Sequence, residues 1–333
     1  MKLPFVNKTA FILVTGASGQ LGRRLVRRLI SHGYRVRAHY RSVEKAQRWC
    51  PPEAEPVFGD LLTPNWLHGA VKGCDIVIHC AAKVSLRPLA RSQQAKSDYM
   101  YNINVNGTKA VVESCFSSNV KRLIHISTVG AVGGSVDGTP LDESASFNLA
   151  GYGIPYFETK YQAEKLALRA NVNPLEAVVV NPSIMISPPD RELTRKDLKK
   201  IPRRLPVYFD FGINLVETDD VIDGIILAMV KGQPGQRYIL AGEDIDPQKA
   251  FYLAEKYLGI KRPLVKIPLW GVYLAGLLAE SFYLFKDKKP ILNRTIARLA
   301  KMRFFYTSKK AERELGYSHR PLEKSIEDIL KVI

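Results

Sequence analysis

The sequence predicts an α/β protein with a doubly wound parallel sheet and a smaller, mostly helical C-terminal lobe. Three observations carry this prediction. Short β-branched runs alternate with helical stretches through the first half of the 333 residues. A glycine-rich segment, Gly16-x-x-Gly19-x-x-Gly22, joins the first run to the first helical stretch, as in Rossmann-type sheets. A tyrosine and a lysine four residues apart, Tyr156 and Lys160, follow in a later helical stretch.

The elements of the first half follow in a regular order. Strands are expected at 10–16, 34–40, 55–60, 75–82, 120–128 and 176–186. Helices are expected at 21–33, at 104–119 and around the tyrosine–lysine pair. Such an order is typical of parallel strands connected by crossover helices.

After Pro182 the alternation breaks. A helix is expected at 216–232, where acidic residues in the first turn suit the helix dipole, and a return strand near 236–242. The remaining chain reads as largely helical. We therefore expect an NAD(P)-binding domain at 1–180, completed by the return strand, and a substrate-binding lobe at 181–333.

The composition is that of a globular protein with a full core, at 46% apolar and 24% charged residues. The four cysteines show no CxxC spacing, and the six histidines are scattered, so neither a disulfide framework nor a metal site is expected. We find no signal-peptide pattern and no uncharged apolar stretch of about 20 residues. A cytoplasmic protein with reduced thiols is the resulting expectation.

The chain is strongly basic, with 49 Lys/Arg against 32 Asp/Glu and a net charge of +17. The charge is densest at 191–206. A basic balance attracts nucleic acid, anionic lipid or acidic substrates, or simply keeps a surface solvated. Because no recognition motif or aromatic stacking platform accompanies the charge, nucleic acid is not expected as a partner.

The glycine-rich loop predicts a dinucleotide site. Without side chains at Gly16, Gly19 and Gly22, the backbone can turn tightly and approach a pyrophosphate, which the N-terminus of the next helix would also attract. The alternative is an ordinary strand–helix turn. The remaining loop residues expected to contact the cofactor are Ser18, Gln20 and Leu21.

The end of the second strand bears on the choice between NAD and NADP. NAD enzymes usually carry an acidic residue there for the ribose 2′-hydroxyl, yet no acid occurs from Arg35 to Ser42. Arg37 lies within this strand and Arg41 just after it, and a guanidinium suits a 2′-phosphate. In so basic a chain, surface charge is the alternative explanation. The sequence favours NADP, with NAD as the other option.

The ends of the next two strands complete the expected cofactor site. Asp60 follows the third strand, where a carboxylate can accept from the adenine amino group or simply cap a turn, and Leu61 comes next. Ala81 and Ala82 end the fourth strand, where small side chains leave room for the nicotinamide ribose.

Tyr156 and Lys160 are expected on one face of a helix. Tyrosine has a pKa near 10, too high for a base at neutral pH, but a lysine about 5 Å away contributes roughly 3 kcal/mol, or about two pKa units. Tyr156 can then exchange a proton with a substrate hydroxyl. Thr128, at the end of the 120–128 strand, is expected to donate to the substrate oxygen, and Ser127 is the adjacent candidate.

These motifs resemble the extended short-chain dehydrogenase/reductases over nearly the whole chain. The matching segments are TGASGQLG, GDL, HCAA, NVNGT, Ser127-Thr128, Tyr156-x-x-x-Lys160 and YTSKKAERELGY. The tract VVVNPSIMISPPD is similar to the dihydroflavonol-reductase-like branch of the NAD-dependent epimerase/dehydratase superfamily. The chain also resembles bacterial hopanoid-associated sugar epimerases and 3β-hydroxysteroid dehydrogenases.

The resemblance implies roles for individual residues. Thr128, Tyr156 and Lys160 fall on the catalytic positions, Asn104 on a helix asparagine that supports the active site, and Pro182 beside the cofactor. Asn181 stands where sugar-nucleotide epimerases usually have an arginine. The resemblance also implies a homodimer formed through the helices near 104–118 and 156–170.

We therefore expect an NADP-dependent oxidoreductase that interconverts a ketone and a secondary alcohol on a small, hydrophobic or lipid-like substrate. The alternative is an NAD(P)-dependent sugar-nucleotide epimerase or dehydratase, and a minor alternative is a non-catalytic dinucleotide sensor. The apolar stretch 270–285 is bordered by lysines and an arginine, which suits either an interfacial helix at a membrane surface or a helix of the core or pocket.

Overall fold

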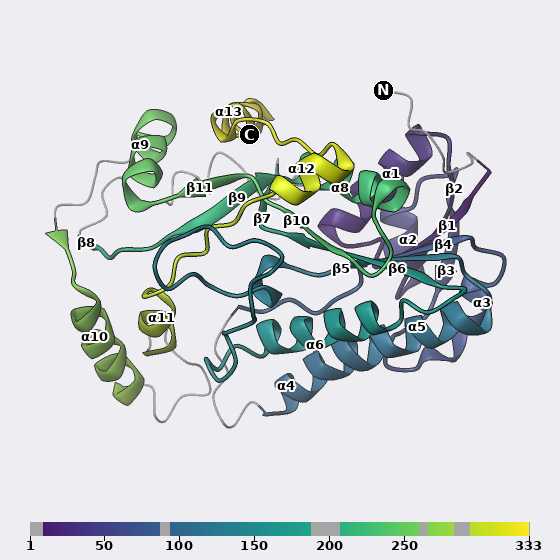
Figure 1. The fold of residues 1–333 in the computed structure, drawn as a ribbon, viewed down its shortest axis with the longest axis horizontal. Helices are drawn as coiled ribbons and strands as arrows, with labels where there is room; N and C mark the ends of the chain where they lie inside the picture. Colours follow the sequence, from purple (N-terminus) through teal and green to yellow (C-terminus); the bar gives the residue numbers. More distant parts are fainter. Residues whose placement is uncertain (1–8, 87–93, 188–206, 260–264, 283–293, 333) are drawn as a thin grey trace.

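The computed structural model describes residues 9–86, 94–187, 207–259, 265–282 and 294–332. Its centre is a parallel sheet of seven strands in the order β10-β6-β5-β4-β1-β2-β3 (Figure 1). The predicted Rossmann-type sheet and the return strand are confirmed. The strands are β1 (Phe11–Thr15), β2 (Arg35–Tyr40), β3 (Glu55–Phe58), β4 (Ile76–His79), β5 (Arg122–Ile126), β6 (Glu176–Pro182) and β10 (Arg237–Leu240).

The strand order reverses between β1 and β4. β1 pairs with β2 on one side and with β4 on the other. The chain therefore leaves these two neighbouring strands toward opposite faces of the sheet. Such a switch point opens a crevice at the carboxyl ends of the strands, where ligands of doubly wound folds bind.

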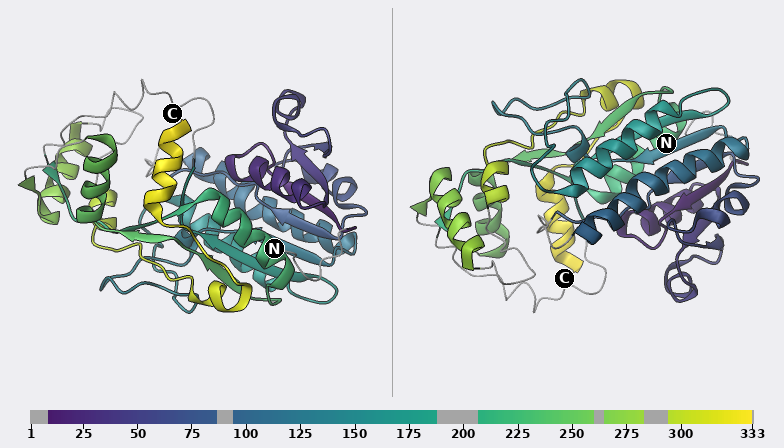
Figure 2. Two further views of the ribbon diagram at one scale, coloured as in Figure 1. Left: turned by 90° about the horizontal axis from the view of Figure 1, so that it is seen from above. Right: turned by 90° about the horizontal axis from the view of Figure 1, so that it is seen from below.

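Helices cover both faces of the sheet (Figures 1 and 2). One face carries α1 (Gln20–Ser31), α2 (Val43–Trp49), α8 (Thr218–Lys231) and α12 (Lys309–Leu315). The other carries α3 (Leu67–Val71), α5 (Gly107–Ser117) and α6 (Pro155–Arg169). Each face has its own cluster of buried apolar side chains, so the sheet is buried on both sides, as its continuous β-branched runs predict.

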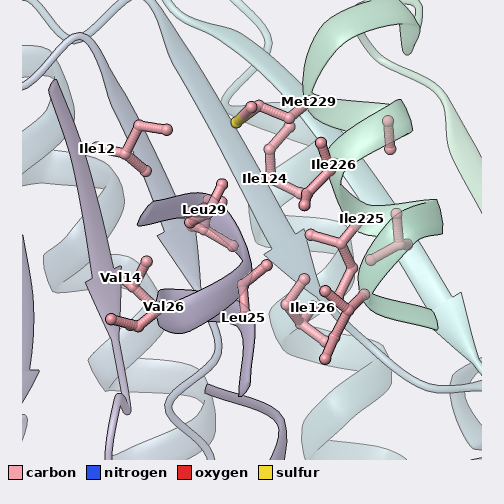
Figure 3. Packing of buried hydrophobic residues seen from close by; sticks show 14 of the residues in the cluster. Ile12, Val14, Leu25, Val26, Leu29, Ile124, Ile126, Ile225, Ile226 and Met229 are labelled. Atoms are coloured by element: carbon pink, nitrogen blue, oxygen red, sulfur yellow. The ribbon is translucent and has the colours of Figure 1, made fainter. Parts of the chain in front are cut away.

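The core under α1 and α8 contains aliphatic side chains of β1, α1, β5 and α8, among other elements (Figure 3). Leu25 and Leu29 of α1 lie over β1, while Ile225 of α8 lies over β5, and all three are fully buried. Burial of each such side chain stabilises the fold by about 1.5–3 kcal/mol. This packing holds the carboxyl ends of β1 and β5, which carry the glycine loop and Thr128, in one rigid layer.

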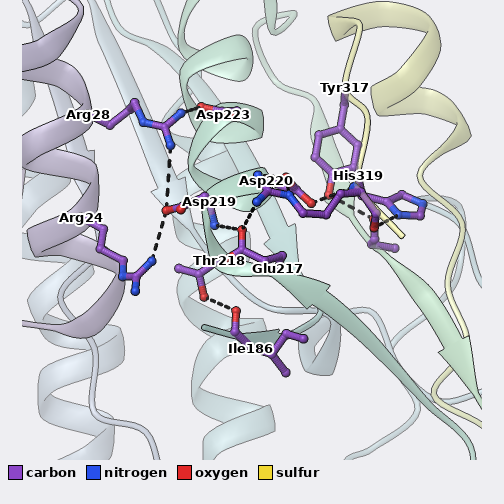
Figure 4. A network of polar contacts seen from close by, with 12 residues as sticks. Arg24, Arg28, Ile186, Glu217, Thr218, Asp219, Asp220, Asp223, Tyr317 and His319 are labelled. Carbon is purple, nitrogen blue, oxygen red and sulfur yellow. Dashed lines mark hydrogen bonds and ion pairs between the residues drawn. The ribbon is translucent and has the colours of Figure 1, made fainter. Parts of the chain in front are cut away.

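Ion pairs join α8 to α1 and to the C-terminal segment (Figure 4). Arg28 of α1 pairs with Asp219 and Asp223, which are partly exposed, so these contacts contribute at most about 1 kcal/mol each. Arg320 donates to the buried Asp220 at 2.8 Å. The C-terminal segment is thereby fixed against the first turn of α8.

The later part of the chain contains strands that the sequence analysis did not predict. The expected strand 176–186 is two strands, β6 and β7 (Ile184–Ile186). β7 joins β9 (Ile213–Glu217) and β11 (Glu243–Ile245) in a second sheet, and β8 (Val207–Tyr208) pairs with β12 (Val265–Lys266). The helices of this part are α9 (Pro247–Leu258), α10 (Leu269–Phe282), α11 (Arg294–Leu299) and α13 (Leu322–Val332).

Two predicted helices differ from the expected bounds at their N-terminal ends, one beginning later and the other earlier. The predicted helix 216–232 starts at Thr218, because Glu217 ends β9 and caps α8 by accepting from Asp219 N at 2.7 Å. The predicted helix 104–119 is α5, preceded by α4 (Gln94–Tyr101) and a π-helical turn at Asn102–Asn106. Such turns are frequent at functional sites.

The domain boundary near residue 180 remains a prediction. β6 runs through it, and α8 and β10, from the later half, pack on the seven-stranded sheet. The most basic stretch, 191–206, and residues 283–285 of the apolar stretch lie outside the described residues.

Candidate active site

The glycine loop closes tightly on the end of β4. Gly16 adopts a left-handed φ of +73°, and a Cβ there would lie 2.7 Å from the Cα of Ala81. A Cβ on Gly22 would lie 2.3 Å from the Gly16 carbonyl oxygen, which already accepts from Gly19 N at 3.0 Å. The loop therefore exists only with glycine at these positions. Its bare backbone at the start of α1 fits the pyrophosphate of a dinucleotide.

A cleft opens beside this loop. Eight of the predicted cofactor residues line it: Gly16, Ser18, Gly19, Arg41, Asp60, Leu61, Ala81 and Ala82. The lining residues that the sequence analysis missed are His39, Cys80, Lys83, Tyr99 and Ile103. The set combines glycine backbone, one guanidinium, one carboxylate and small apolar side chains, which fits the parts of a nicotinamide dinucleotide.

Several predicted residues stand behind the cleft. Gln20 bonds to the Ser187 hydroxyl, Leu21 packs against the core under α1, and Gly22 supports the turn. Pro182 is buried at the end of β6. These residues shape the surroundings of the cleft and do not line it.

Arg37 lies away from the cleft, which corrects the expectation for this residue. Its guanidinium donates to the Glu55 carboxylate at 2.7 Å and to the carbonyls of Ala70 and Lys72 at 2.6 and 3.0 Å. These bonds fix β2 to β3 and to the end of α3. The exposed Arg41 alone of the two arginines lines the cleft.

His39 links the end of β2 to the glycine loop. Its Nδ1 accepts from Gly16 N at 3.3 Å, its Nε2 lies 2.9 Å from the Gly59 carbonyl, and its ring stacks on Trp66. Because Gly16 N donates to Nδ1, the Nε2 nitrogen carries the proton. Burial lowers the pKa of His39, so the ring is neutral. His39 lies two positions after Arg37 and two before Arg41, and residues two apart in a strand point to the same face. This spacing is the sequence signal for His39.

Asp60 caps a turn at the edge of the cleft. Its Oδ1 accepts from Leu62 N at 3.0 Å, and its carbonyl accepts from Trp66 Nε1 at 2.9 Å. The turn role is thus present, and the carboxylate also faces the cleft.

Thr128, Tyr156 and Lys160 come together between β5 and α6. Pro155 at the first turn starts α6, and Tyr156 and Lys160 are buried at 9% and 3% exposure. The Thr128 hydroxyl acts on the Tyr156 phenol by lowering its pKa, and it accepts from Gly130 N at 3.3 Å. The Lys160 ammonium donates to the Ile126 carbonyl at 2.6 Å.

The pKa values of this group differ from the sequence-based expectation. Burial raises the pKa of Tyr156 to about 12, and the Thr128 hydroxyl offsets only part of this rise. Burial also lowers the pKa of Lys160 to about 8, against the opposing effect of Glu164. The expected lowering of the Tyr156 pKa by Lys160 is not found, because desolvation of the phenol dominates. Tyr156 therefore holds its proton at neutral pH.

Ser127 is engaged elsewhere, which corrects its place as a catalytic candidate. Its hydroxyl donates to the buried Glu164 carboxylate at 2.5 Å. The two neighbouring hydroxyls after β5 therefore have separate partners, Gly130 N for Thr128 and Glu164 for Ser127.

Asn104 connects the cleft to α6, the helix that carries Tyr156 and Lys160. Its amide accepts from Lys83 N at 2.7 Å and donates to the Lys83 carbonyl and to Thr159 Oγ1, both at 3.0 Å. The Thr159 hydroxyl in turn donates to the Tyr156 carbonyl at 3.1 Å. The π-helical turn thus places a buried amide that ties the cleft wall to α6.

Two further observations concern the cysteines and the possible metal ligands. All four cysteines are free. Within the described residues, no cluster of His, Cys, Asp and Glu could hold a metal ion.

Comparison with known proteins identifies the family. Residues 12–241 match the NAD dependent epimerase/dehydratase family. The chain is 31% identical to the 4-hydroxy-2-methyl-3-oxo-4-farnesyl-3,4-dihydroquinoline-1-oxide ketoreductase of Stigmatella aurantiaca, over 96% of this chain and 95% of that protein. It is 29% identical to sterol demethylase protein B of Methylococcus capsulatus, over 91% and 92% of the two chains.

A solved structure agrees over the whole length. The crystal structure of gox2253 superposes with a TM-score of 0.78 at 31% identity and covers 98% of both chains. The glycine cleft and the Tyr156–Lys160–Thr128 group thus occur in a chain that is similar from end to end to reductases. The chain belongs to the NAD dependent epimerase/dehydratase family, as an NAD(P)-dependent reductase or dehydrogenase of the extended short-chain type.

Proposed function

We propose that this enzyme uses NADP to interconvert a ketone and a secondary alcohol on a lipophilic small molecule, with Tyr156 as the acid/base. The observation that carries the proposal is the burial of Tyr156 and Lys160 one helical turn apart on α6, beside the dinucleotide cleft, where Thr128 acts on the phenol by lowering its pKa. When bound, the nicotinamide ring supplies or accepts the hydride.

The protonation states support the reductive direction. Because the pKa of Tyr156 is about 12, its phenol is a proton donor at neutral pH and can protonate a carbonyl oxygen as negative charge develops there. The Thr128 hydroxyl accepts from Gly130 N, so its own proton is available to donate to the same oxygen. The Lys160 ammonium, one helical turn from Tyr156, is the charge proposed to stabilise the phenolate as the proton leaves, an effect that the raised pKa of the resting phenol does not show.

Arg41 is the residue proposed to select NADP. It is exposed at the cleft beyond β2, and a guanidinium binds a 2′-phosphate through charge-assisted bonds worth about 1.5–3 kcal/mol. Arg41→Ala is therefore expected to weaken NADPH binding about 10- to 100-fold and leave NADH binding unchanged, measured by fluorescence titration. Arg35→Ala, at the opposite end of β2, is the matched control. Equal loss for both cofactors in the Arg41 variant would refute the assignment.

The surroundings of Tyr156 support a lipophilic substrate. Its buried neighbours are apolar: Met100, Leu149, Ile154, Leu299 and Met302. The names of the two relatives refer to a farnesyl quinoline oxide and to sterol. Steady NADPH oxidation with long-chain or polycyclic ketones, and none with small polar ketones, is the expected result. A preference for polar ketones would contradict it.

The alternative is a sugar-nucleotide epimerase or dehydratase, which the family name covers. Such an enzyme keeps its dinucleotide bound through the cycle. Protein purified with tightly held, non-exchanging dinucleotide and no ketone-dependent NADPH oxidation would favour it. The amide of Asn181 argues against a role in binding a sugar nucleotide, since it donates to Thr128 O and to Glu164.

We also propose that α10 contacts the surface of an anionic membrane. A stripe along this helix is exposed and apolar: Trp270 at 72%, Tyr273 at 43%, Leu274 at 48%, Leu277 at 38% and Leu278 at 56%. Basic residues border the stripe in the sequence, and Lys266 precedes it. Aromatic and leucine side chains with basic neighbours suit an interfacial helix. Among the helices of the described residues, none is long and apolar enough to cross a membrane.

The opposite side of α10 leads toward the catalytic group. α10 packs on α11, and Leu299 and Met302, in and beside α11, belong to the apolar cluster around Tyr156. Figure 2 shows α10 at the end of the molecule away from β3. A lipid substrate could therefore reach Tyr156 from a bilayer on which α10 lies.

Trp270 provides the test. It is exposed, whereas Trp49 and Trp66 are partly buried, so a blue shift of the emission on mixing with vesicles reports mainly on Trp270. We expect the shift with phosphatidylcholine–phosphatidylglycerol vesicles at low salt. Leu274→Glu should abolish it, and Val136→Glu, at a more exposed apolar site elsewhere, should not. No shift with anionic vesicles would exclude the contact.

We further propose a homodimer formed through α5 and α6, which lie side by side on one face of the sheet (Figure 1). Light scattering should give about twice the chain mass of 37.4 kDa. A mass of one chain at micromolar concentration would rule it out.

A further inference from the structure

A buried carboxylate lies one helical turn beyond Lys160. Glu164 is only 1% exposed and accepts three hydrogen bonds, from Ser127 Oγ at 2.5 Å, Asn181 Nδ2 at 2.6 Å and the Arg237 guanidinium at 2.9 Å. A buried carboxylate with a charged partner and three donors keeps its negative charge. The mechanism of proton transfer described above does not use it.

The three donors come from the ends or edges of neighbouring strands. Ser127 follows β5, Asn181 lies in β6, and Arg237 begins β10. The Asn181 amide nitrogen also donates to the Thr128 carbonyl at 3.0 Å. The strand end that carries Thr128 is thus tied to the helix that carries Tyr156.

Glu164 also acts on Lys160 electrostatically. The two are four residues apart on α6, and the carboxylate raises the pKa of Lys160 against the lowering by burial. The other titratable groups that act on or near this ammonium are Cys80, which follows β4, and the neutral, buried His79 of β4 and His125 of β5. Arg237 offsets part of the charge of Glu164 from its far side.

We propose that Glu164 is a positioning residue of the active site, which holds Thr128 against Tyr156 and keeps Lys160 positively charged at neutral pH. The first role acts through the bonds of Ser127 and Asn181, and the second through the charge of the carboxylate. The catalytic part of this inference rests on the proposed ketone reduction, whereas the charge of Lys160 can be measured without turnover.

Glu164→Gln separates the two roles from a purely structural one. The alkaline limb of the kcat profile, where Lys160 loses its proton, should move from about pH 8 downward by about one unit, because the carboxylate no longer favours the ammonium. A structural residue would lower kcat by the same factor at every pH. Glu158→Gln, the same change at a half-buried position of α6 that accepts from Gly151 N, should leave the limb in place.

Two further variants keep the proposal testable where Glu164→Gln is poorly folded. Glu164→Asp retains the charge and should restore the limb to within about 0.3 units of the wild type. Ser127→Ala retains the charge and removes one donor, so it should lower kcat about 3- to 10-fold without moving the limb. A limb that moves equally in Ser127→Ala would overturn the electrostatic role.

An NMR titration of ¹³C-labelled lysine makes the test independent of the reaction. The Lys160 signal, identified by its absence in Lys160→Met, should titrate about one unit lower in Glu164→Gln than in the wild type. An unchanged titration would refute the proposal even for an active enzyme. Conversely, a shifted titration in a protein that reduces no ketone would contradict the proposed function and leave the role of Glu164 standing.

Discussion

The Lys160 ammonium donates to the carbonyl of Ile126 at 2.6 Å. Ile126 is the last residue of β5, and Thr128 follows two residues later. The lysine is therefore bonded to the strand that leads to Thr128, while its helix carries Tyr156. This bond ties β5 to α6 and links the three side chains proposed to act in proton transfer.

Replacement of Tyr156 by phenylalanine removes the proton donor and keeps the ring. We expect kcat to fall about 10²- to 10⁴-fold, since general acid catalysis contributes a factor of this size. NADPH affinity should stay within about twofold, because the cleft is unchanged. Stopped-flow turnover and a binding titration on the same preparation check both parts, and a variant with full turnover would contradict the acid role of Tyr156.

Asn104→Ala should weaken the connection between the cleft and α6. The variant removes the partner of the Lys83 amide and one of the two partners of the buried Thr159 hydroxyl, at a cost of about 0.5–1.5 kcal/mol per bond in the free energy of unfolding. We expect a lower urea midpoint together with a lower kcat/KM. Asn106→Ala, at an exposed position of the same π-helical turn, should change neither.

Gly22→Ala tests the tightness of the glycine loop. The added Cβ would meet the Gly16 carbonyl oxygen at 2.3 Å, so the turn must shift. We expect dinucleotide affinity to drop at least tenfold, as isothermal titration would show. Gly69→Ala places its Cβ in open space within α3 and serves as the control. Similar affinities in the two variants would contradict a pyrophosphate site at this loop.

Stability should fall as the pH is lowered from 7 to 5. Burial lowers the pKa of His79 to about 3, between its bonds to Thr15 and Thr108. Between pH 6.5 and 3 the unfolded chain therefore binds a proton at this residue that the folded chain does not, and the free energy of unfolding decreases. At pH 5 the loss is about 2 kcal/mol for His79 alone.

Urea unfolding at the two pH values measures this loss. The His79→Gln variant should show a smaller decrease between pH 7 and pH 5 than the wild type, whatever its absolute stability. His68→Gln, at an exposed histidine, should show the full decrease. A wild type with equal stability at both pH values would argue against buried, neutral histidines.

The sequence predicted the features whose causes are local. The glycine loop, the alternation of strands and helices in the nucleotide-binding half and the Tyr156–Lys160 spacing follow from short-range rules, and the structure places the loop at the cleft and the pair on one helix as expected. The distinction between Arg37 and Arg41 depends instead on what lies beside β2. Arg37 donates to a carbonyl oxygen of α3 and to the carboxylate of Glu55, and no local sequence pattern predicts these contacts.

Ser127 and Glu164 show the same limit. Their bond joins residues 37 positions apart, and the burial that makes it strong is a property of the assembled sheet and helix. The spacing of Glu164, four residues after Lys160, was a usable signal. The lowered pKa of Lys160 and the raised pKa of Tyr156 could not be predicted from spacing, because the desolvation that causes both arises from packing.

The bond between Glu164 and Arg237 spans 73 residues of chain. During synthesis, a nascent chain that has emerged as far as α6 already contains Thr128, Tyr156 and Lys160, while the arginine that neutralises Glu164 is still to be made. The catalytic centre is therefore completed by a late-made strand at the sheet's edge. A ribosome-bound fragment that ends before β10 is expected to lack activity although every catalytic side chain is present.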